Sequence, residues 1–215
     1  MIVLELFAGL RSISKAFEAR GHTTFSVDWN KNLDNISLYE NISNMTYKDV
    51  INLCGGIPDV IWASPDCTTY SVAAISYHRT KDETTGSLNP KTEYAKFCDK
   101  SNRHLINLIS QLKPKYWFIE NPRGGLRKME FMQGLPRYTI TYCKYGDFRQ
   151  KPTDIWTNHP NPQFNPPCKS GSYCHERAPR GSKTGTQRIK GTSKRAIIPA
   201  KLCEHIVNIC ELGFK

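Results

Sequence analysis

The apolar residues in the first two thirds of the chain follow two different spacings. Short runs rich in apolar residues, which are typical of buried strands, occur at residues 2–7, 24–27, 60–63 and 116–119. Between these runs, apolar residues recur every three or four positions, as they do on the buried face of a helix; the clearest stretches are listed as residues 10–21 and 105–112. This alternation predicts an α/β fold, with a mostly parallel sheet and helices on both of its faces.

Shorter patterns suggest the remaining elements. We expect a short helix around Leu38 and a short strand at residues 45–47. Residues 138–142 and 155–157 are predicted to form two further strands, which are close enough in the sequence to pair. The last helical pattern begins at Pro199, where a proline suits the first helical position.

Two long polar segments interrupt this order. Residues 76–98 form a loop in this interpretation, and loops of that length in compact domains are usually lids over a site or disordered. Residues 159–193 are rich in Pro, Gly, Ser, Lys and Arg and lack the apolar residues for a core. We therefore predict a core at 1–157, a small basic insertion at 158–194 and a C-terminal helix at 195–215 that completes the core.

Polar or reactive residues follow each of the four buried runs. Gly9 forms a turn after the first, Asp28 ends the second, Cys67 lies in the polar segment after the third, and Glu120 and Asn121 follow the fourth. The carboxyl ends of parallel strands meet at one edge of a sheet, where α/β proteins bind their ligands. We therefore expect these residues to share one crevice, although Gly9 alone also suits an ordinary strand–turn–helix connection.

The crevice would contain the residue types that nucleophilic catalysis requires. Cys67 would lie on a turn at a strand end, close to Pro65, and would face the crevice. A cysteine acts as a nucleophile in its thiolate form, which needs a positively charged or hydrogen-bonding environment. A carboxyl group held at the next strand end, such as that of Glu120, can serve as a general acid.

The charge of the chain favours a polyanionic partner. The formal net charge is +11, and the basic residues gather in one stretch: Lys144, Arg149, Lys151, Lys169, Arg177, Arg180, Lys183, Arg188, Lys190, Lys194 and Arg195. The acids in the same stretch are Asp147, Asp154 and Glu176. Such a cluster favours nucleic acid, because neutralising phosphates releases counterions. The alternative is a solvated basic face without a ligand.

The sequence also bears on location and on the state of the cysteines. No apolar stretch approaches the roughly 20 residues that a membrane span requires, and residues 2–7 read as a strand rather than a signal peptide. We therefore expect a cytoplasmic protein without a membrane partner, whose eight cysteines are reduced thiols rather than disulfides. Cys203 and Cys210 fit the apolar side of the last helix and are interpreted as core residues.

Three residues of the insertion suggest a metal. Cys168, Cys174 and His175 have the spacing C-x5-C-H, and His159 is a candidate fourth ligand. A zinc ion could order a segment that has no core of its own. The spacing matches no standard zinc module, so a loop without metal is the alternative.

Taken together, these motifs resemble the DNA cytosine-5 methyltransferase family. The resemblance rests on Phe7-Ala8-Gly9, on residues 65–71 around Cys67, on Glu120-Asn121, on residues 145–151 and on residues 195–206, in the family's order along nearly the whole chain. It implies a Rossmann-like fold that binds S-adenosylmethionine, with double-stranded DNA as the partner. Nothing in the sequence indicates oligomerisation, so we expect a monomer. Family members usually carry a substantial target-recognition domain, which is much reduced here.

The resemblance also implies roles for individual residues. Cys67 would add to carbon 6 of a cytosine flipped out of the duplex, Glu120 would stabilise charge at ring nitrogen 3, and Asn121 and Arg123 would position the cysteine loop and the base. The implied cofactor-binding residues are Phe7, Ala8, Gly9, Leu10, Asp28, Trp29, Asp49 and Pro65. The implied substrate contacts are Ser71, Arg149, Lys151, Arg177, Arg180 and Lys183. As alternatives, Trp29 is a surface aromatic and Asp49 a helix N-cap.

The chain departs from the family pattern at several positions. Asp66 stands where a second proline is usual, and a carboxylate beside a thiol raises the thiol pKa unless it points away. Arg149, Lys151 and Thr153 stand where Gln, Arg and Arg are typical. Because the basic segment is short, we expect it to contact mainly DNA phosphates, with a short or loosely read target.

Two other functions remain open at this level. An RNA cytosine-5 methyltransferase is the closer alternative, because relatives of the catalytic core act on tRNA, and a basic loop does not distinguish A-form from B-form partners. A catalytically inactive nucleic-acid-binding relative is the other alternative. The presence of both Cys67 and Glu120 argues against it.

Overall fold

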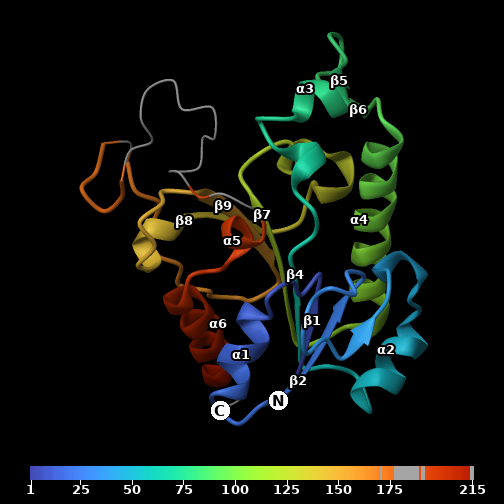
Figure 1. Cartoon of the computed structure of the whole chain (residues 1–215), viewed down its shortest axis with the longest axis vertical. Helices are drawn as coiled ribbons and strands as arrows, with labels where there is room; N and C mark the ends of the chain where they lie inside the picture. The colour runs from blue at the N-terminus through green and yellow to red at the C-terminus, as the bar shows by residue number, and fades with distance from the viewer. Residues whose placement is uncertain (170, 177–188, 190–191, 214–215) are drawn as a thin grey trace.

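A seven-stranded sheet forms the centre of the computed structural model, which describes residues 1–169, 171–176, 189 and 192–213 (Figure 1). The strands of this sheet are β1 (Ile2–Leu6), β2 (Thr23–Asp28), β3 (Leu38–Tyr39), β4 (Val60–Ala63), β7 (Tyr116–Pro122), β8 (Arg137–Thr141) and β9 (Pro152–Thr157). A separate hairpin consists of β5 (Arg79–Lys81) and β6 (Leu88–Pro90). The α-helices are α1 (Ser12–Glu18), α2 (Tyr47–Cys54), α3 (Ile75–His78), α4 (Glu93–Leu112), α5 (Thr192–Ala196) and α6 (Ala200–Leu212).

The sheet is mostly parallel, as the alternating sequence pattern predicts. Its order is β3-β2-β1-β4-β7-β9-β8, in which neighbours from β3 to β7 run parallel and β9 runs antiparallel to both β7 and β8. The carboxyl ends of β1, β2, β4 and β7 therefore lie on one edge. The chain continues from β1 to β2 and from β4 to β7, which lie in opposite directions along the sheet. α/β sheets bind ligands at the strand ends where the strand order reverses in this way.

Helices cover both faces of the sheet. Figure 1 shows α1 and α6 side by side on one face, with α2 and α4 on the other. Successive strand residues point to opposite faces, so Leu4 of β1 joins a cluster with Leu105 of α4, whereas Val3 joins a cluster with Phe17 of α1 and Ile206 of α6. The predicted α/β class, with helices on both faces, is confirmed.

A buried carboxylate fixes the connection from β1 to α1. Glu5, which is 2% exposed, accepts hydrogen bonds from the Ile13 amide (3.3 Å), the Ser14 amide (2.7 Å) and the Ser14 hydroxyl (2.6 Å). Burial raises the pKa of Glu5, while the bonds from Ser14 and Ile13 oppose the rise. Amide groups of the first helical turn have no partner within the helix, and here a strand side chain supplies one. The turn between them is thereby held at the ligand-binding edge.

Two short elements differ from the sequence-based prediction. The segment around Leu38 is strand β3 rather than a helix, because Leu38 pairs with Val27 at the edge of the sheet. The segment predicted as a strand at 45–47 leads into helix α2, because Thr46 and Asp49 form a reciprocal capping box that starts a helix at Tyr47. The capping box decides that a helix begins at Tyr47, and a pattern of three residues does not reveal such a cap.

The predicted loop at 76–98 is also more structured than expected. It contains most of α3, the β5–β6 hairpin and the start of α4, whose N-cap Thr92 accepts a hydrogen bond from the Ala95 amide (3.2 Å). At the other end of the chain, Pro199 is the N-cap of α6 rather than its first residue. Helix α5 crosses the predicted boundary between residues 194 and 195. None of the helices in the described part of the chain is long and apolar enough to span a membrane.

Candidate active site

Cys67 lies on a tight turn directly after β4. Its carbonyl oxygen accepts hydrogen bonds from the amides of Tyr70 (3.1 Å) and Ser71 (2.8 Å), which close a short 3-10 helix over Thr68–Tyr70. The Oδ1 atom of Asp66 accepts a further bond from the Thr68 amide (2.6 Å). These contacts fix the backbone on both sides of Cys67.

The end of β7 supports the same turn. The Asn121 side chain, which is 1% exposed, donates a hydrogen bond from Nδ2 to the Pro65 carbonyl (2.8 Å). Further along, the Gly125 amide donates to the Tyr70 carbonyl (2.7 Å), and a Cβ atom at Gly124 would lie 2.5 Å from that oxygen. Glycine is therefore required at position 124, because the strand end and the cysteine turn approach too closely for a side chain.

Glu120 lies at the same strand end and is 5% exposed. Its Oε1 accepts a hydrogen bond from the hydroxyl of Tyr142 (2.9 Å), which is fully buried. The Lys151 Nζ lies 4.3 Å from the centre of the Tyr142 ring and donates to the Arg195 carbonyl (3.2 Å). Burial lowers the pKa of Lys151, and the Glu120 carboxylate opposes that change. A carboxyl group, a phenol and an ammonium group therefore meet beside the cysteine turn.

The electrostatic surroundings of Cys67 favour the thiol over the thiolate. Burial raises the pKa of Cys67 to about 11, with further contributions from the carboxylates of Asp66 and Glu120, while Lys151 lowers it. The Asp66 carboxylate, which stands where the family pattern has a proline, therefore adds to the effect of burial on the pKa of Cys67.

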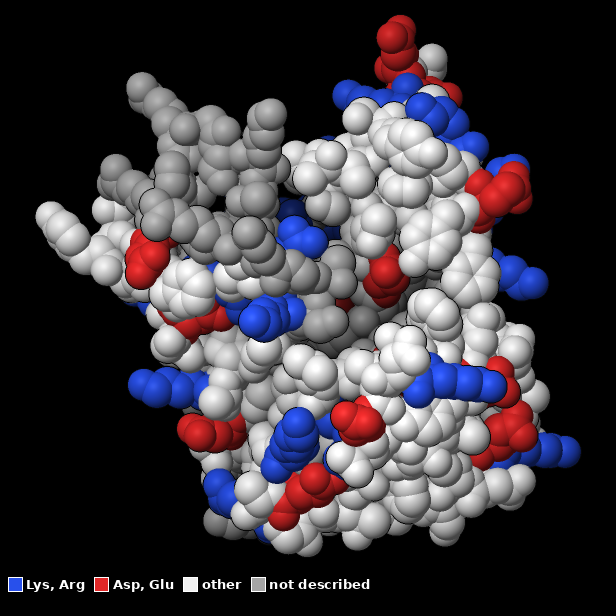
Figure 2. All heavy atoms as spheres, viewed as in Figure 1, with Lys and Arg blue, Asp and Glu red and all other residues white. Residues whose placement is uncertain are grey.

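A cavity of about 380 Å³ opens beside the cysteine turn. Its walls come from the ends of β1, β2 and β4, from the segment after β3, and from α4: Phe7, Trp29, Asn41, Ile42, Pro65, Asp66, Tyr94, Phe97, Cys98, Ser101 and Asn102. Figure 2 shows a hollow between the lobe that carries α3, β5 and β6 and the rest of the molecule. The volume and the mixture of aromatic walls with a few polar groups are typical of small-molecule sites.

A glycine turn and a buried carboxylate adjoin this cavity. Gly9 has a positive φ of 50°, and its amide donates to Oδ2 of Asp28 (3.0 Å). The Asn30 amide donates to Oδ1 of the same carboxylate (2.9 Å). Phe7 also has a positive φ, 53°, a conformation that costs energy for a residue with a side chain and recurs at functional sites. The chain thus bends sharply where β1 meets the cavity.

Several other predicted site residues do not line this cavity. Asp49 does not line the cavity, and its Oδ2 accepts from the amide and hydroxyl of Thr46 (both 2.7 Å). Leu10 is 42% exposed and Arg123 is exposed, while Ala8 is buried. Ser71 closes the cysteine turn through its amide. The predicted contacts Arg177, Arg180 and Lys183 lie outside the described residues.

Arg149 takes a structural position rather than the predicted substrate-facing one. It is 4% exposed and forms an ion pair with Asp147 through several hydrogen bonds. Its Nη atoms also donate to the carbonyls of Arg195 (3.1 Å) and Ile197 (3.4 Å). The guanidinium group therefore connects the segment before β9 to the approach to α6.

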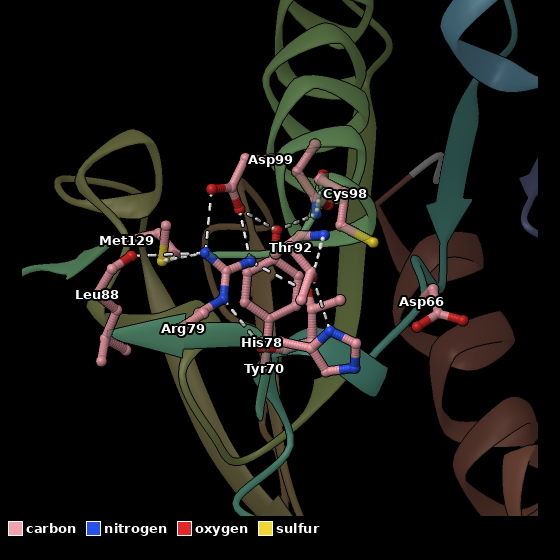
Figure 3. A network of polar contacts seen from close by, with 12 residues as sticks. Asp66, Tyr70, His78, Arg79, Leu88, Thr92, Cys98, Asp99 and Met129 are labelled. Atoms are coloured by element: carbon pink, nitrogen blue, oxygen red, sulfur yellow. Dashed lines mark hydrogen bonds and ion pairs between the residues drawn. The ribbon is translucent and has the colours of Figure 1, made fainter. Parts of the chain in front are cut away.

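A buried ion pair connects the segment that follows Cys67 to helix α4. Arg79 of β5 donates from Nη1 and Nη2 to the carboxylate of Asp99 on α4 (3.0 and 2.7 Å), as Figure 3 shows. It also donates to the Thr69 carbonyl (2.9 Å), and its guanidinium carbon lies 4.2 Å from the centre of the Tyr70 ring. The Tyr70 hydroxyl donates to the same Asp99 carboxylate (2.7 Å). The hairpin, α4 and the cysteine turn are thereby joined at one point.

We expect Arg79→Met to lower the free energy of unfolding by about 3–5 kcal/mol, because it leaves the Asp99 carboxylate buried without its cation. The Arg79 side chain is 0% exposed and that of Asp99 is 13% exposed. The double variant Arg79→Met/Asp99→Leu should lose less, since no unpaired charge remains. Urea unfolding followed by circular dichroism measures both changes.

The exposed ion pair between Lys96 and Glu93 on α4 provides the matched control. Lys96→Met should leave the free energy of unfolding unchanged within error, because exposed pairs contribute little. An Arg79→Met variant as stable as Lys96→Met would show that the buried pair does not hold the cysteine turn.

Sequence reasoning missed three groups of site residues. Tyr94, Phe97 and Cys98 line the cavity from α4, in a segment interpreted as a loop. Tyr142 lies in a segment predicted to be a strand, and Arg79 lies in the segment interpreted as a loop. The aromatic spacing of Tyr94 and Phe97, three residues apart and followed by a clear helical pattern, is the signal that could have extended the helix.

Comparisons with known proteins agree on one family. The sequence profile of C-5 cytosine-specific DNA methylases matches residues 1–135. A protein of frog virus 3 (isolate Goorha), named "Probable DNA (cytosine-5)-methyltransferase", is 27% identical over 231 aligned positions, which cover 98% of this chain and 100% of the viral protein.

A solved structure shows the same fold. A protein described as a DNA modification methyltransferase encoded within an E. coli prophage matches with a TM-score of 0.52 and 15% identity, over 73% of this chain and 46% of that one. The Dnmt2 methyltransferase of S. pombe matches with a TM-score of 0.49 and 15% identity, over 73% of this chain and 48% of that one. The chain therefore spans about half the length of these two proteins. The likeness to the prophage protein supports the predicted Rossmann-like fold.

Proposed function

The chain belongs to the C-5 cytosine-specific DNA methylase family, and we propose that it transfers a methyl group from S-adenosylmethionine to carbon 5 of cytosine in double-stranded DNA. One observation carries the proposal. The Cys67 turn and the Glu120 carboxyl lie at the ends of the neighbouring strands β4 and β7, and Asn121 joins the two by a hydrogen bond to Pro65. The full-length likeness to the frog virus 3 protein favours DNA over RNA.

Cys67 and Glu120 would act on the two sides of one ring. Carbon 5 of cytosine is a poor nucleophile, and addition of the Cys67 thiolate to carbon 6 moves an electron pair towards carbon 5. Glu120 would donate a hydrogen bond or proton to ring nitrogen 3 and so stabilise the charge that develops. After methylation, loss of the proton from carbon 5 and departure of Cys67 restore the aromatic ring. The base must leave the duplex first, at a cost of a few kcal/mol.

Tyr142 and Lys151 would support these two residues. The Tyr142 hydroxyl bonds one oxygen of Glu120 and leaves the other for the base. Lys151 lowers the pKa of Cys67 and is the basic group that opposes the two carboxylates. We therefore assign Tyr142 to positioning Glu120, and Lys151 to favouring the thiolate.

The cavity residues fit S-adenosylmethionine. Phe7 and Trp29 offer aromatic surfaces for the adenine, and Trp29 is 68% exposed without a ligand. The buried Asp28 carboxylate, oriented by Gly9 and Asn30, suits ribose hydroxyl groups. When bound, S-adenosylmethionine would supply the methyl group. Asp49 is not included, because it caps α2.

Methyl transfer to two classes of nucleic acid tests the proposal. The purified chain is incubated with labelled S-adenosylmethionine and either a mixed-sequence DNA duplex or a tRNA pool, and the digested nucleosides are analysed by mass spectrometry. We expect 5-methyl-2′-deoxycytidine from the duplex. Product from tRNA alone would establish the RNA alternative, and product from neither would overturn the proposed activity.

Sequencing of methylated DNA from cells that express the protein extends this test to the target. The insertion is short, and its residues Arg177, Arg180 and Lys183 stay predicted phosphate contacts. We therefore expect methylation at a short or degenerate sequence. A long, strictly read site would contradict the predicted mode of recognition.

We expect Asp66→Asn to make Cys67 more reactive at neutral pH. The Asp66 carboxylate raises the pKa of the thiol, so its removal should lower that pKa and increase the thiolate fraction at every pH below it. The asparagine oxygen can still accept the bond from Thr68. Alkylation of Cys67 by iodoacetamide, followed by peptide mass spectrometry from pH 6 to 10, should give a rate curve displaced to lower pH.

The Glu130→Gln variant serves as the control, because it removes a carboxylate that is 91% exposed and lies outside the Cys67 turn. Its Cys67 curve should not move. An unchanged or upward displacement of the Cys67 curve would show that Asp66 does not suppress the thiolate.

A further inference from the structure

Four potential metal ligands converge where the insertion meets the core. They are the sulfur atoms of Cys143, Cys168 and Cys174 and a ring nitrogen of His175, and all lie within 4.8 Å of one another. Cys143 belongs to the 3-10 helix that follows β8, Tyr142–Tyr145, whereas the other three come from the insertion. Residues far apart in the sequence thus form one cluster.

Three of the four distances within the cluster match the edges of a metal-centred tetrahedron, and the fourth, between Cys143 and Cys168, is shorter. The Cys143 Sγ lies 3.2 Å from that of Cys168 and 3.6 Å from that of Cys174. The His175 Nδ1 lies 3.6 Å from the Cys168 Sγ and 3.7 Å from the Cys174 Sγ. Tetrahedral zinc with bonds of about 2.3 Å to sulfur and 2.0–2.1 Å to nitrogen requires separations of about 3.5–3.8 Å between its ligands. A disulfide would instead bring two sulfurs to about 2.05 Å.

His159, the fourth ligand considered from the sequence, is a core residue instead. Its Nε2 lies 3.2 Å from the Ile209 carbonyl, and its Nδ1 accepts from the Asn161 amide (3.2 Å). Its ring packs 4.5 Å from that of Tyr116. Both ring nitrogens therefore have protein partners, and Cys143 takes the place that the sequence suggested for His159.

Hydrogen bonds orient the cluster from outside. The Cys168 amide donates to the Thr141 hydroxyl (3.0 Å), and the Gln150 amide group donates to the Cys168 sulfur (3.3 Å). Donors of this kind hold thiolate ligands in place in metal sites. Of the insertion's described aromatic residues, Phe164 packs against the core, while Tyr173 is fully exposed. A segment with so little apolar contact needs another source of order.

We propose that Cys143, Cys168, Cys174 and His175 bind a structural zinc ion that fastens the insertion to the catalytic core. Three thiol protons leave when the ion binds, and the three thiolates and neutral imidazole fill its four positions. The neighbour of Cys143 is Tyr142, which bonds the catalytic Glu120. The ion therefore orders the basic insertion next to the residue that positions the general acid.

Metal analysis of the full-length protein tests the site independently of any methyltransferase activity. Protein from zinc-supplemented cells is analysed by inductively coupled plasma mass spectrometry, and we expect one zinc ion per chain. Cobalt substitution should give the visible bands of a tetrahedral site and the near-ultraviolet bands of thiolate ligation. Protein without stoichiometric metal, or with a disulfide between Cys143 and Cys168, would overturn the proposal.

Two variants within the insertion identify the ligands. Cys174→Ser and His175→Asn change partly exposed side chains, and each should weaken zinc binding at least about 10-fold in competition with a chromophoric chelator. Removing the ion should also speed tryptic cleavage within residues 158–194. Cys54→Ala, in α2, should retain zinc as the matched control. Full retention by His175→Asn, or loss only in His159→Ala, would contradict the assigned ligand set.

Discussion

Replacing Cys67 by alanine should lower the rate of methyl transfer by at least about 10⁴-fold, because it removes the nucleophile that we propose adds to carbon 6 of the base. Cys98 also lines the cavity, but it lies on α4 rather than on the turn after β4. Binding of S-adenosylmethionine should change little, since Cys67 is not among the residues that line the cavity. Single-turnover methyl transfer to duplex DNA and isothermal titration with the cofactor measure the two effects separately.

Cys54→Ala is the matched control for this variant, because Cys54 is a buried cysteine at the end of α2. It should keep the wild-type rate. A Cys67→Ala protein that retains more than about one hundredth of the wild-type rate would exclude the nucleophile assigned here.

Replacing Glu120 by glutamine should lower the rate about 10²–10⁴-fold, the range expected for loss of a positioned general acid. Glutamine can still accept the hydrogen bond from Tyr142, so the fold and the cysteine turn should persist. It cannot transfer a proton to ring nitrogen 3. The rate of methyl transfer under single-turnover conditions, with saturating DNA and cofactor, isolates this step from binding.

Two further variants test whether the effect of Glu120→Gln is specific to this carboxyl group. Glu130→Gln changes a side chain that is 91% exposed and should leave the rate unchanged. Tyr142→Phe removes the bond that orients Glu120 and should cause a smaller loss than Glu120→Gln itself. If Tyr142→Phe is the more damaging variant, the tyrosine rather than the carboxyl group carries the acid role.

The buried strands and their polar ends could be predicted from the sequence. Residues 60–63 form β4 with the predicted bounds, because a run of apolar residues between prolines permits little else. Because the carboxyl ends of parallel strands share one edge, the sequence also predicts that Cys67, Glu120 and Asp28 lie at the same edge of the sheet. A cytoplasmic location and a monomeric state stay predictions.

The rest of the site depends on contacts that a linear pattern does not contain. The first half of α4 packs against the core on one side and lines a cavity on the other. Tyr94 and Phe97 therefore lack the apolar sequence neighbours that indicate a buried helix. Arg149 was predicted as a DNA contact from the resemblance of residues 145–151 to the family, yet Asp147 two residues earlier pairs with it in the interior. Cys143 joins Cys168 only because β8 ends beside the insertion.

The central claim is that the Cys67 thiolate adds to the target cytosine. A DNA duplex in which the target carries fluorine at carbon 5 tests it, because the fluorine cannot leave as the proton does and the enzyme stays attached. With S-adenosylmethionine present, we predict a covalent complex that survives denaturing electrophoresis, with the modified peptide containing Cys67. Absence of this complex in a preparation that methylates ordinary duplex DNA, or attachment through another residue, would contradict the mechanism.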